Sequence, residues 1–133
     1  MPEKTTLKRA RADLRAGKSP STAAGEFVRE EMEHIRRGKH GARSPEQAIA
    51  IGLSKARRAG VPLKPPKKGQ AKKSTRKSAK RDYEVGQGKR RKSAPSRKRS
   101  KAMTKRLKRE GSSAASHSAL SRHAKRVSSK RRR

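Results

Sequence analysis

Residues 44–60 of the sequence, SPEQAIAIGLSKARRAG, decide the fold. Ser44 is a favourable N-cap, Pro45 suits the first helical position, and Gln47 occupies the place of the second residue in a capping box. Apolar residues then recur at helical spacing, basic residues fill the last turn, and a glycine provides the left-handed stop. The stretch therefore predicts a helix over residues 45–59.

The same kinds of helix-start and helix-stop residues predict two helices nearer the N-terminus. Ser19 and Pro20 repeat the pattern of a capping serine followed by a proline at the first helical position. Apolar side chains follow at near-helical spacing, and each segment ends at a glycine. We therefore expect helices over residues 6–16 and 20–37, which complete a small helical domain over residues 1–63.

The sequence changes character after Leu63. Pro62, Pro65 and Pro66 prevent the third helix from continuing. Twenty-eight of the 42 basic residues lie in residues 64–133 beside three acidic ones, which gives this half +25 of the formal charge of +32. So much like charge either meets a polyanion or keeps the chain expanded.

The basic half contains few large apolar side chains and one aromatic residue, Tyr83. Such a composition cannot bury enough surface to offset the entropy of ordering the backbone. We therefore expect residues 64–133 to form a disordered tail, with possible helices over residues 102–110 and 114–128 once phosphate neutralises their charge. The predicted fold class is all-α, a small three-helix N-terminal domain followed by this long disordered basic tail.

The composition excludes several classes of protein and site. No cysteine is present, so disulfides, Fe–S clusters and thiolate zinc sites are impossible. The longest apolar run, residues 48–53, is far too short to span a bilayer, and no signal peptide is recognisable. We expect a cytoplasmic protein without a transmembrane segment.

No catalytic, cofactor or metal site is predicted. His34 and His40 lack further ligands at characteristic spacing, so we interpret them as ordinary surface histidines. Glu30, Glu31 and Glu33 are interpreted as a solvated helix face, or as a face that holds the basic tail when nucleic acid is absent. We expect no enzymatic activity, no cofactor and no small-molecule substrate.

Three segments carry a family resemblance: residues 17–31 (GKSPSTAAGEFVREE), 34–41 (HIRRGKHG) and 42–60 (ARSPEQAIAIGLSKARRAG). They resemble a family of small basic bacterial proteins, a domain of unknown function whose members are often labelled DNA-binding. The resemblance covers about residues 1–66. It implies a bacterial protein of the cytoplasm or nucleoid, and it implies no catalytic or ligand residues.

The charge of the basic half predicts a nucleic-acid partner, and our leading hypothesis is sequence-nonspecific binding of double-stranded DNA through its backbone phosphates. One aromatic residue cannot provide the stacking platforms that single-strand binders use. The loop over residues 38–43 is too long for the turn of a helix-turn-helix reader. If a third of the tail's cations touch phosphate, about 9 contacts give a log–log salt slope near roughly −8.

Two alternatives remain open, because charge alone does not separate them. The first is an RNA-binding or ribosome-associated protein, whose basic tail threads between rRNA helices. The second is a protein-interaction head with a polybasic localisation tail, in which Ile51 and Leu63 form the contact surface.

The residues predicted to contact nucleic acid are basic and lie at the end of the third predicted helix or beyond it. For those at the helix end, complementing the helix dipole is an equally consistent role. The full set is Lys55, Arg57, Arg58, Lys67, Lys68, Lys72, Lys73, Arg76, Lys77, Lys80, Arg81, Lys89, Arg90, Arg91, Lys92, Arg97, Lys98, Arg99, Lys101, Lys105, Arg106, Lys108, Arg109, Arg122, Lys125, Arg126, Lys130, Arg131, Arg132 and Arg133.

Overall fold

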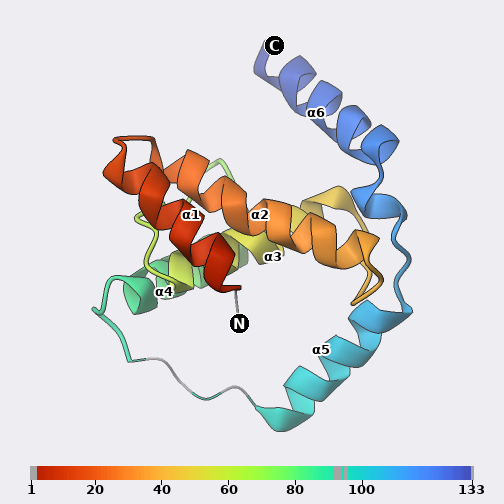
Figure 1. Ribbon diagram of the computed structural model, residues 1–133, viewed down its shortest axis with the longest axis horizontal. Coiled ribbons are helices and arrows are strands. Elements are labelled where there is room, and N and C mark those ends of the chain that lie inside the picture. Colours follow the sequence, from red (N-terminus) through yellow and green to blue (C-terminus); the bar gives the residue numbers. More distant parts are fainter. Residues whose placement is uncertain (1–2, 92–93, 95, 133) are drawn as a thin grey trace. The chain divides into compact units, whose positions relative to one another are not determined.

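The computed structural model describes residues 3–91, 94 and 96–132, and these form helices joined by loops (Figure 1). No β-strand occurs over these ranges, where the only bridge is an isolated one between Lys68 and Ala71. The elements are α1 (Lys4–Arg15), α2 (Pro20–Arg36), α3 (Pro45–Arg58), α4 (Lys73–Gly86), α5 (Arg97–Arg109), the 3₁₀ turn η1 (Ser113–Ala115) and α6 (His117–Arg132).

The chain divides into two compact units. Unit 1 consists of Met1–Glu30 and Ile51–Ser93, and unit 2 consists of Glu31–Ala50 and Ala94–Arg133. The division falls inside α2 and inside α3, so each of these helices contributes one part to each unit. The boundary that the sequence predicts after Leu63 lies within unit 1.

The core of unit 1 is built around Phe27 of α2, which is completely buried. Most of its buried neighbours are alanines, so the helices must approach closely to leave no void. Partly buried leucines of α1 and α3 cover the edge of this core. The cluster is Ala10, Ala23, Ala24, Phe27, Ala56 and Val61, with Leu7, Leu14, Leu53 and Leu63 packed against it.

Within unit 1, α4 is attached to the end of α3 by small residues and polar contacts. Gly86 lies against the carbonyl of Arg57 with no room for a Cβ atom, and Ala79 is buried. The carboxylate of Asp82 accepts a hydrogen bond of 2.9 Å from the Ser54 hydroxyl. α4 therefore packs by close backbone approach and a hydrogen bond rather than by bulky apolar side chains.

Unit 2 is held by small apolar residues and by backbone hydrogen bonds between segments distant in sequence. Ile35 and Ala48 are completely buried, and the alanines of η1 are buried as well. Arg36 Nε donates to the carbonyl of Ala115 at 2.9 Å. The amide of Gly41 donates to the carbonyl of Leu107 at 2.8 Å, so the loop after α2 contacts the last turn of α5.

The helical character of the chain is confirmed, but the expected long disordered tail is wrong. Residues 64–133 contain α4, α5, η1 and α6, and the helical fold continues through the basic half. The expectation failed because it counted large apolar side chains. Ala79 of α4 and Ala119 of α6 are buried instead, and packing of small residues orders these helices with little apolar surface.

The helix bounds differ in detail from the expected ones. α1, α2 and α3 lie within two residues of the predicted ranges. The possible helix over residues 102–110 becomes α5, which begins earlier because the Ser96 hydroxyl accepts from the amide of Arg99. The possible helix over residues 114–128 becomes α6, which begins later and runs to Arg132; α4 had no predicted counterpart.

The two ends of α3 follow the local sequence closely. The Ser44 hydroxyl accepts from the amide of Gln47 at 3.2 Å, while the Gln47 side chain accepts from the amide of Arg43 at 2.7 Å. At the other end Gly60 has a φ of 104°, and the Val61 amide donates to the carbonyl of Ala56, as in a Schellman motif. Val61 is 4% exposed and closes the motif against the core.

Two helical glycines should respond oppositely to alanine. A Cβ atom at Gly52 of α3 would lie 2.7 Å from the Cα atom of Val28, whereas a Cβ atom at Gly25 of α2 would meet nothing within 4 Å. Glycine to alanine in an open helix position stabilises by about 0.5–1 kcal/mol, and overpacking costs about 1–3 kcal/mol. Thermal unfolding followed by circular dichroism should show a higher Tm for Gly25→Ala and a lower Tm for Gly52→Ala. Equal shifts in one direction would contradict the close approach of α2 and α3 at Gly52.

Candidate nucleic-acid interface

Almost all of the predicted nucleic-acid contacts for which a side chain is described point into solvent. Arg57 is buried, and Lys55 and Arg76 are half-buried; every other member of the set with a described side chain is exposed. Four members lie outside the described side chains: Lys92, Arg131, Arg132 and Arg133. The chain therefore folds with its cations on the outside, where a polyanion can reach them.

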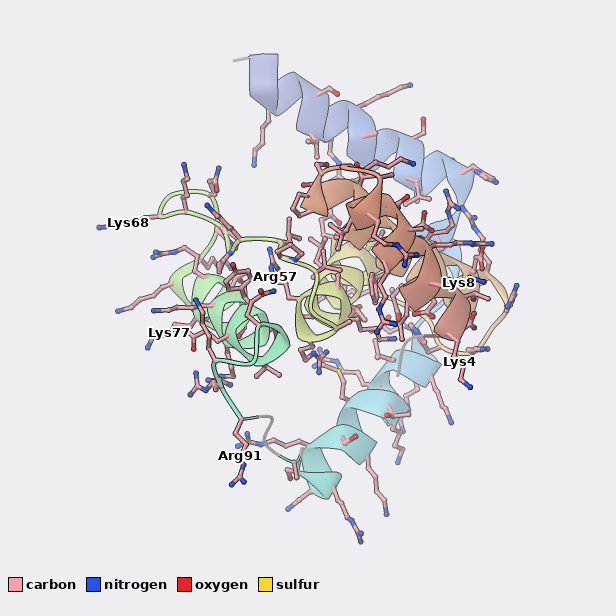
Figure 2. All side chains as sticks on the ribbon, turned by 60° about the vertical axis from the view of Figure 1, so that its left-hand side comes forward. Lys4, Lys8, Arg57, Lys68, Lys77 and Arg91 are labelled. Carbon is pink, nitrogen blue, oxygen red and sulfur yellow. The ribbon has the colours of Figure 1, made fainter. Side chains whose placement is uncertain are left out.

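Four of the five cations of α4 lie on the side turned away from its buried face, and the fifth, Arg76, is half-buried. Lys73, Lys77 and Arg81 recur every four residues, which places them in one row along the helix, and Lys80 flanks this row. All four are exposed, whereas Ala79 on the opposite side is 5% exposed. Figure 2 shows Lys77 pointing outward from α4. The helix thus offers a continuous row of positive charge.

α5 is the most basic helix and has no buried residue. Lys101, Lys105 and Lys108 share one side at spacings of four and three residues. Met103, 51% exposed, and the half-buried Leu107 lie on another side. Such a helix gains little from packing, so neutralisation of its charge by phosphate would stabilise it.

α6 combines exposed cations with one internal ion pair. Arg122, Lys125 and Lys130 are exposed. The Arg126 guanidinium lies 3.2 Å from the Glu46 carboxylate, and His123 Nδ1 lies 3.0 Å from the same oxygen. Within unit 2, Glu46 therefore connects α6 to the first turn of α3.

Arg57 has a position unlike that of the other predicted contacts. Its side chain is 8% exposed, and its guanidinium donates to the carbonyls of Leu63 at 3.2 Å and Lys64 at 3.3 Å. Burial lowers the pKa of Arg57. Its charge is used inside unit 1 to hold the chain where it leaves α3. Among the predicted contacts with a described side chain, Arg57 is the only one that is buried.

Acidic side chains of the basic half lie beside cations of the same unit. Arg58 Nε is 3.7 Å from Asp82, and Arg90 is 3.8 Å from Glu84. Such partly exposed pairs contribute little stability by themselves. These two ion pairs neutralise the predicted contacts Arg58 and Arg90, and they involve none of the cations in the rows on α4 and α5.

The sequence reasoning missed a further row of cations on α1. Lys4, Lys8, Arg11 and Arg15 are exposed and, together with Leu7, line a shallow depression. Their spacing of i, i+4, i+7 and i+11 places them on one side of a helix and is visible in the sequence, but the prediction of contacts considered only the more basic half. In Figure 2, Lys4 and Lys8 lie on one side of unit 1, and Lys68 and Lys77 lie on the other.

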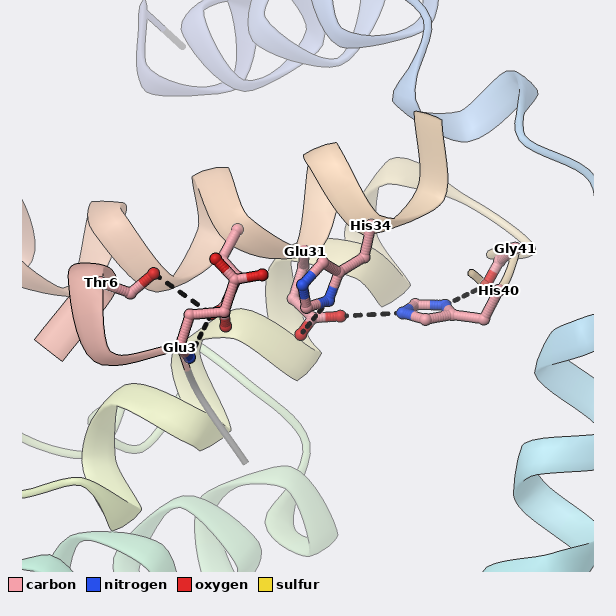
Figure 3. A network of polar contacts seen from close by, with 7 residues as sticks. Glu3, Thr6, Glu31, His34, His40 and Gly41 are labelled. Carbon is pink, nitrogen blue, oxygen red and sulfur yellow. Dashed lines mark hydrogen bonds and ion pairs between the residues drawn. The ribbon is translucent and has the colours of Figure 1, made fainter. Parts of the chain in front are cut away.

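The acidic cluster of α2 is not the solvated face that the sequence suggested. Glu30 is 4% exposed and accepts hydrogen bonds from the amide of Glu3 and the hydroxyl of Thr6 within unit 1 (Figure 3). Glu31 is completely buried. Glu33 is the most exposed of the three glutamates but is half-buried, and it pairs with Arg37.

His34 and His40 are not ordinary surface histidines. Within unit 2 their side chains are 12% and 18% exposed, and both lie beside the Glu31 carboxylate, at 3.9 Å and 3.1 Å (Figure 3). The signal available in the sequence was the i, i+3 spacing of Glu31 and His34 on one helix. It could not show that the loop after α2 returns His40 to the same carboxylate.

Comparison with known proteins adds nothing to this geometry. No protein-family model matches the chain, and no match was found among curated proteins or among solved structures. Within the described part of the chain, no helix is both long enough and apolar enough to cross a membrane. The function therefore has to be argued from the residues themselves.

Asp82 should anchor α4 more strongly than Glu84 does. Asp82 accepts the hydroxyl hydrogen bond of Ser54, whereas Glu84 makes an ion pair with the exposed Arg90. Urea unfolding should show a loss of about 1.5 kcal/mol or more for Asp82→Ala and less than about 1 kcal/mol for Glu84→Ala. A larger loss for Glu84→Ala would show that the contact with α3 does not hold α4.

The Glu46 carboxyl should titrate at unusually low pH. Its own backbone amide and the hydrogen bond from His123 lower the pKa of Glu46. The contact with α6 is therefore complete above the ordinary glutamate pKa of 4.5 and is lost as the pH falls through the lowered value. Carboxyl-selective NMR titration should show the Glu46 midpoint rising in His123→Ala and unchanged in His117→Ala. A midpoint insensitive to His123 would contradict the contact.

Proposed function

We propose that this protein binds double-stranded DNA without sequence specificity, by contacts of lysine and arginine with backbone phosphates. The observation that carries the proposal is the outward exposure of the basic side chains along α4, α5 and α6. Each of these helices bears charges at regular intervals, and a duplex presents phosphates at regular intervals. Binding then follows from counterion release and requires no reading of base edges.

The few aromatic residues support a duplex rather than a single strand as the partner. Tyr83 is the one aromatic side chain of the basic half, and it is half-buried in unit 1. Phe27 is completely buried. Single-strand binders use exposed aromatic rings on which bases stack, and neither ring is offered in that way.

The arrangement of the acids also supports the proposal. Asp82, Glu84 and Glu46 each lie beside a cation of their own unit. Internal pairing of this kind keeps carboxylates from repelling an approaching phosphate backbone. The resemblance of residues 1–66 to basic bacterial proteins makes the bacterial nucleoid the setting that we propose.

The salt dependence of binding tests this function. For the full chain and a mixed-sequence duplex, the logarithm of the binding constant plotted against the logarithm of the salt concentration should have a slope of about −8. This slope should not change with the base composition of the duplex. Replacing Lys73, Lys77 and Lys80 of α4 by glutamine should make the slope less negative by up to about 3, because each phosphate contact contributes about one unit to its magnitude. Fluorescence anisotropy at several salt concentrations measures both quantities.

A matched variant separates contact from net charge. Lys4→Gln, Lys8→Gln and Arg11→Gln on α1 remove the same charge from the other side of unit 1. A smaller loss for this variant supports contact through α4, and an equal loss assigns binding to diffuse charge. A clear preference for folded rRNA over duplex DNA at equal phosphate concentration would overturn the proposal in favour of an RNA partner. If neither variant changes the slope or the affinity, α4 and α1 do not contact the duplex.

A further inference from the structure

Glu31, His34 and His40 form a buried group of metal-ligating side chains that nucleic-acid binding does not use. Glu31 and His34 lie one turn apart near the C-terminal end of α2, and His40 lies in the loop that follows. All three belong to unit 2. One ligand atom from each residue lies within 4.8 Å of the others. The group is distinct from the exposed rows of lysine and arginine.

The orientation of the His40 ring is fixed by the backbone. Its Nδ1 atom is 2.9 Å from the carbonyl oxygen of Gly41. A carbonyl only accepts, so Nδ1 carries a proton and donates. Metal-binding histidines commonly donate their second ring N–H to a carbonyl in this way, which leaves the other nitrogen as the ligand atom.

The second ring nitrogen of His40 faces the Glu31 carboxylate. Nε2 lies 3.1 Å from Oε2 of Glu31, which is completely buried. With Nδ1 protonated, a neutral imidazole directs the Nε2 lone pair at this carboxylate oxygen, which is unfavourable. A proton on Nε2, or a metal ion bound to both atoms, removes this repulsion.

His34 adds a second imidazole to the same carboxylate. Its Nδ1 atom lies 3.9 Å from Oε1 of Glu31, and the two histidine rings are 6.4 Å apart in an edge-on arrangement. With metal–ligand bonds of about 2.0–2.2 Å, the ligand atoms of a tetrahedral zinc ion are roughly 3.4 Å apart. His40 approaches Oε2 of Glu31 at 3.1 Å and His34 approaches Oε1 at 3.9 Å, so the two imidazoles lie beside different oxygens of one carboxylate at separations close to this value.

We infer that Glu31, His34 and His40 form a binding site for a divalent transition-metal ion of the zinc type. Two imidazoles and one carboxylate are a ligand set that zinc accepts, with a water molecule in the fourth position. Imidazole ligands favour zinc, cobalt, nickel or copper over magnesium and calcium, which prefer oxygen. The metal ion would accept the Nε2 lone pair of His40 and an oxygen of Glu31, and so would remove the repulsion between these two atoms.

The site would connect the end of α2 to the loop that holds α5 in unit 2. Gly41 orients His40 through its carbonyl and donates its own amide to Leu107, while the Ala42 amide donates to the carbonyl of Gly111 at 3.1 Å. Gly41 lies against the backbone of Glu110 with no room for a Cβ atom. Metal binding at His40 would therefore affect the conformation of this loop and of the last turn of α5.

Cobalt titration of the full, chelator-treated chain tests the site. One equivalent of Co²⁺ should produce the visible absorption of a tetrahedral complex, and one equivalent of Zn²⁺ should remove it. In the wild-type chain, NMR should show Zn²⁺ shifting the ring signals of His34 and His40 and leaving those of His117 and His123 unchanged. This second readout does not depend on whether a variant folds.

Matched variants assign the ligands. His34→Gln, His40→Gln and Glu31→Gln should each weaken Co²⁺ binding about tenfold or more. The double variant His117→Gln/His123→Gln and the variant Glu33→Gln, which changes a half-buried glutamate outside the group, should bind as the wild type does. Circular dichroism checks that each variant remains helical.

The inference is overturned if the wild-type chain binds no stoichiometric cobalt, or if zinc shifts the rings of His117 and His123 instead. It is equally overturned if a helical His40→Gln variant keeps full affinity. Any of these results would show that the contact between His40 and Glu31 is not a metal site. None of them bears on DNA binding, which the anisotropy measurements test separately.

Discussion

The structure depends on the close approach of helices through small residues. A chain with a formal charge of +32 has few bulky apolar side chains, so it cannot fold by enclosing a large core. Gly52 brings α3 against the backbone of Val28, and Gly86 brings α4 against the carbonyl of Arg57. Contacts of this kind gain dispersion energy over many backbone atoms and leave the opposite face of each helix free for charge.

Local capping chemistry could be predicted from the sequence, and long-range packing could not. The ends of α3 follow from Ser44, Gln47 and Gly60, because each acts on backbone groups within a few residues. α4 escaped prediction because what orders it is the fit of Ala79 and Gly86 against residues far away in sequence. The same is true of Glu31 and His40, whose contact is made by a loop.

The same distinction applies to the predicted nucleic-acid contacts, because some positions follow from local properties and others depend on long-range packing. Exposure of the cations on α4, α5 and α6 follows from charge alone, since a lysine without a partner stays in water. The inward position of Arg57 depends on two carbonyls, those of Leu63 and Lys64, that only the folded chain places within its reach. A planar guanidinium offers its donors in a rigid fork, which suits two such carbonyls. The class of partner stays a prediction from composition, and the folded structure shows that Arg57 serves the fold.

The outward placement of so many cations gives salt two opposite effects on this protein. Added salt screens the repulsion between neighbouring lysines and arginines, and so favours the folded helices. The same ions would compete with the protein's cations for phosphate and would weaken the nucleic-acid binding that we propose. High salt would therefore favour the free, folded chain, whereas low salt would favour binding to a polyanion and would destabilise a chain that has none bound.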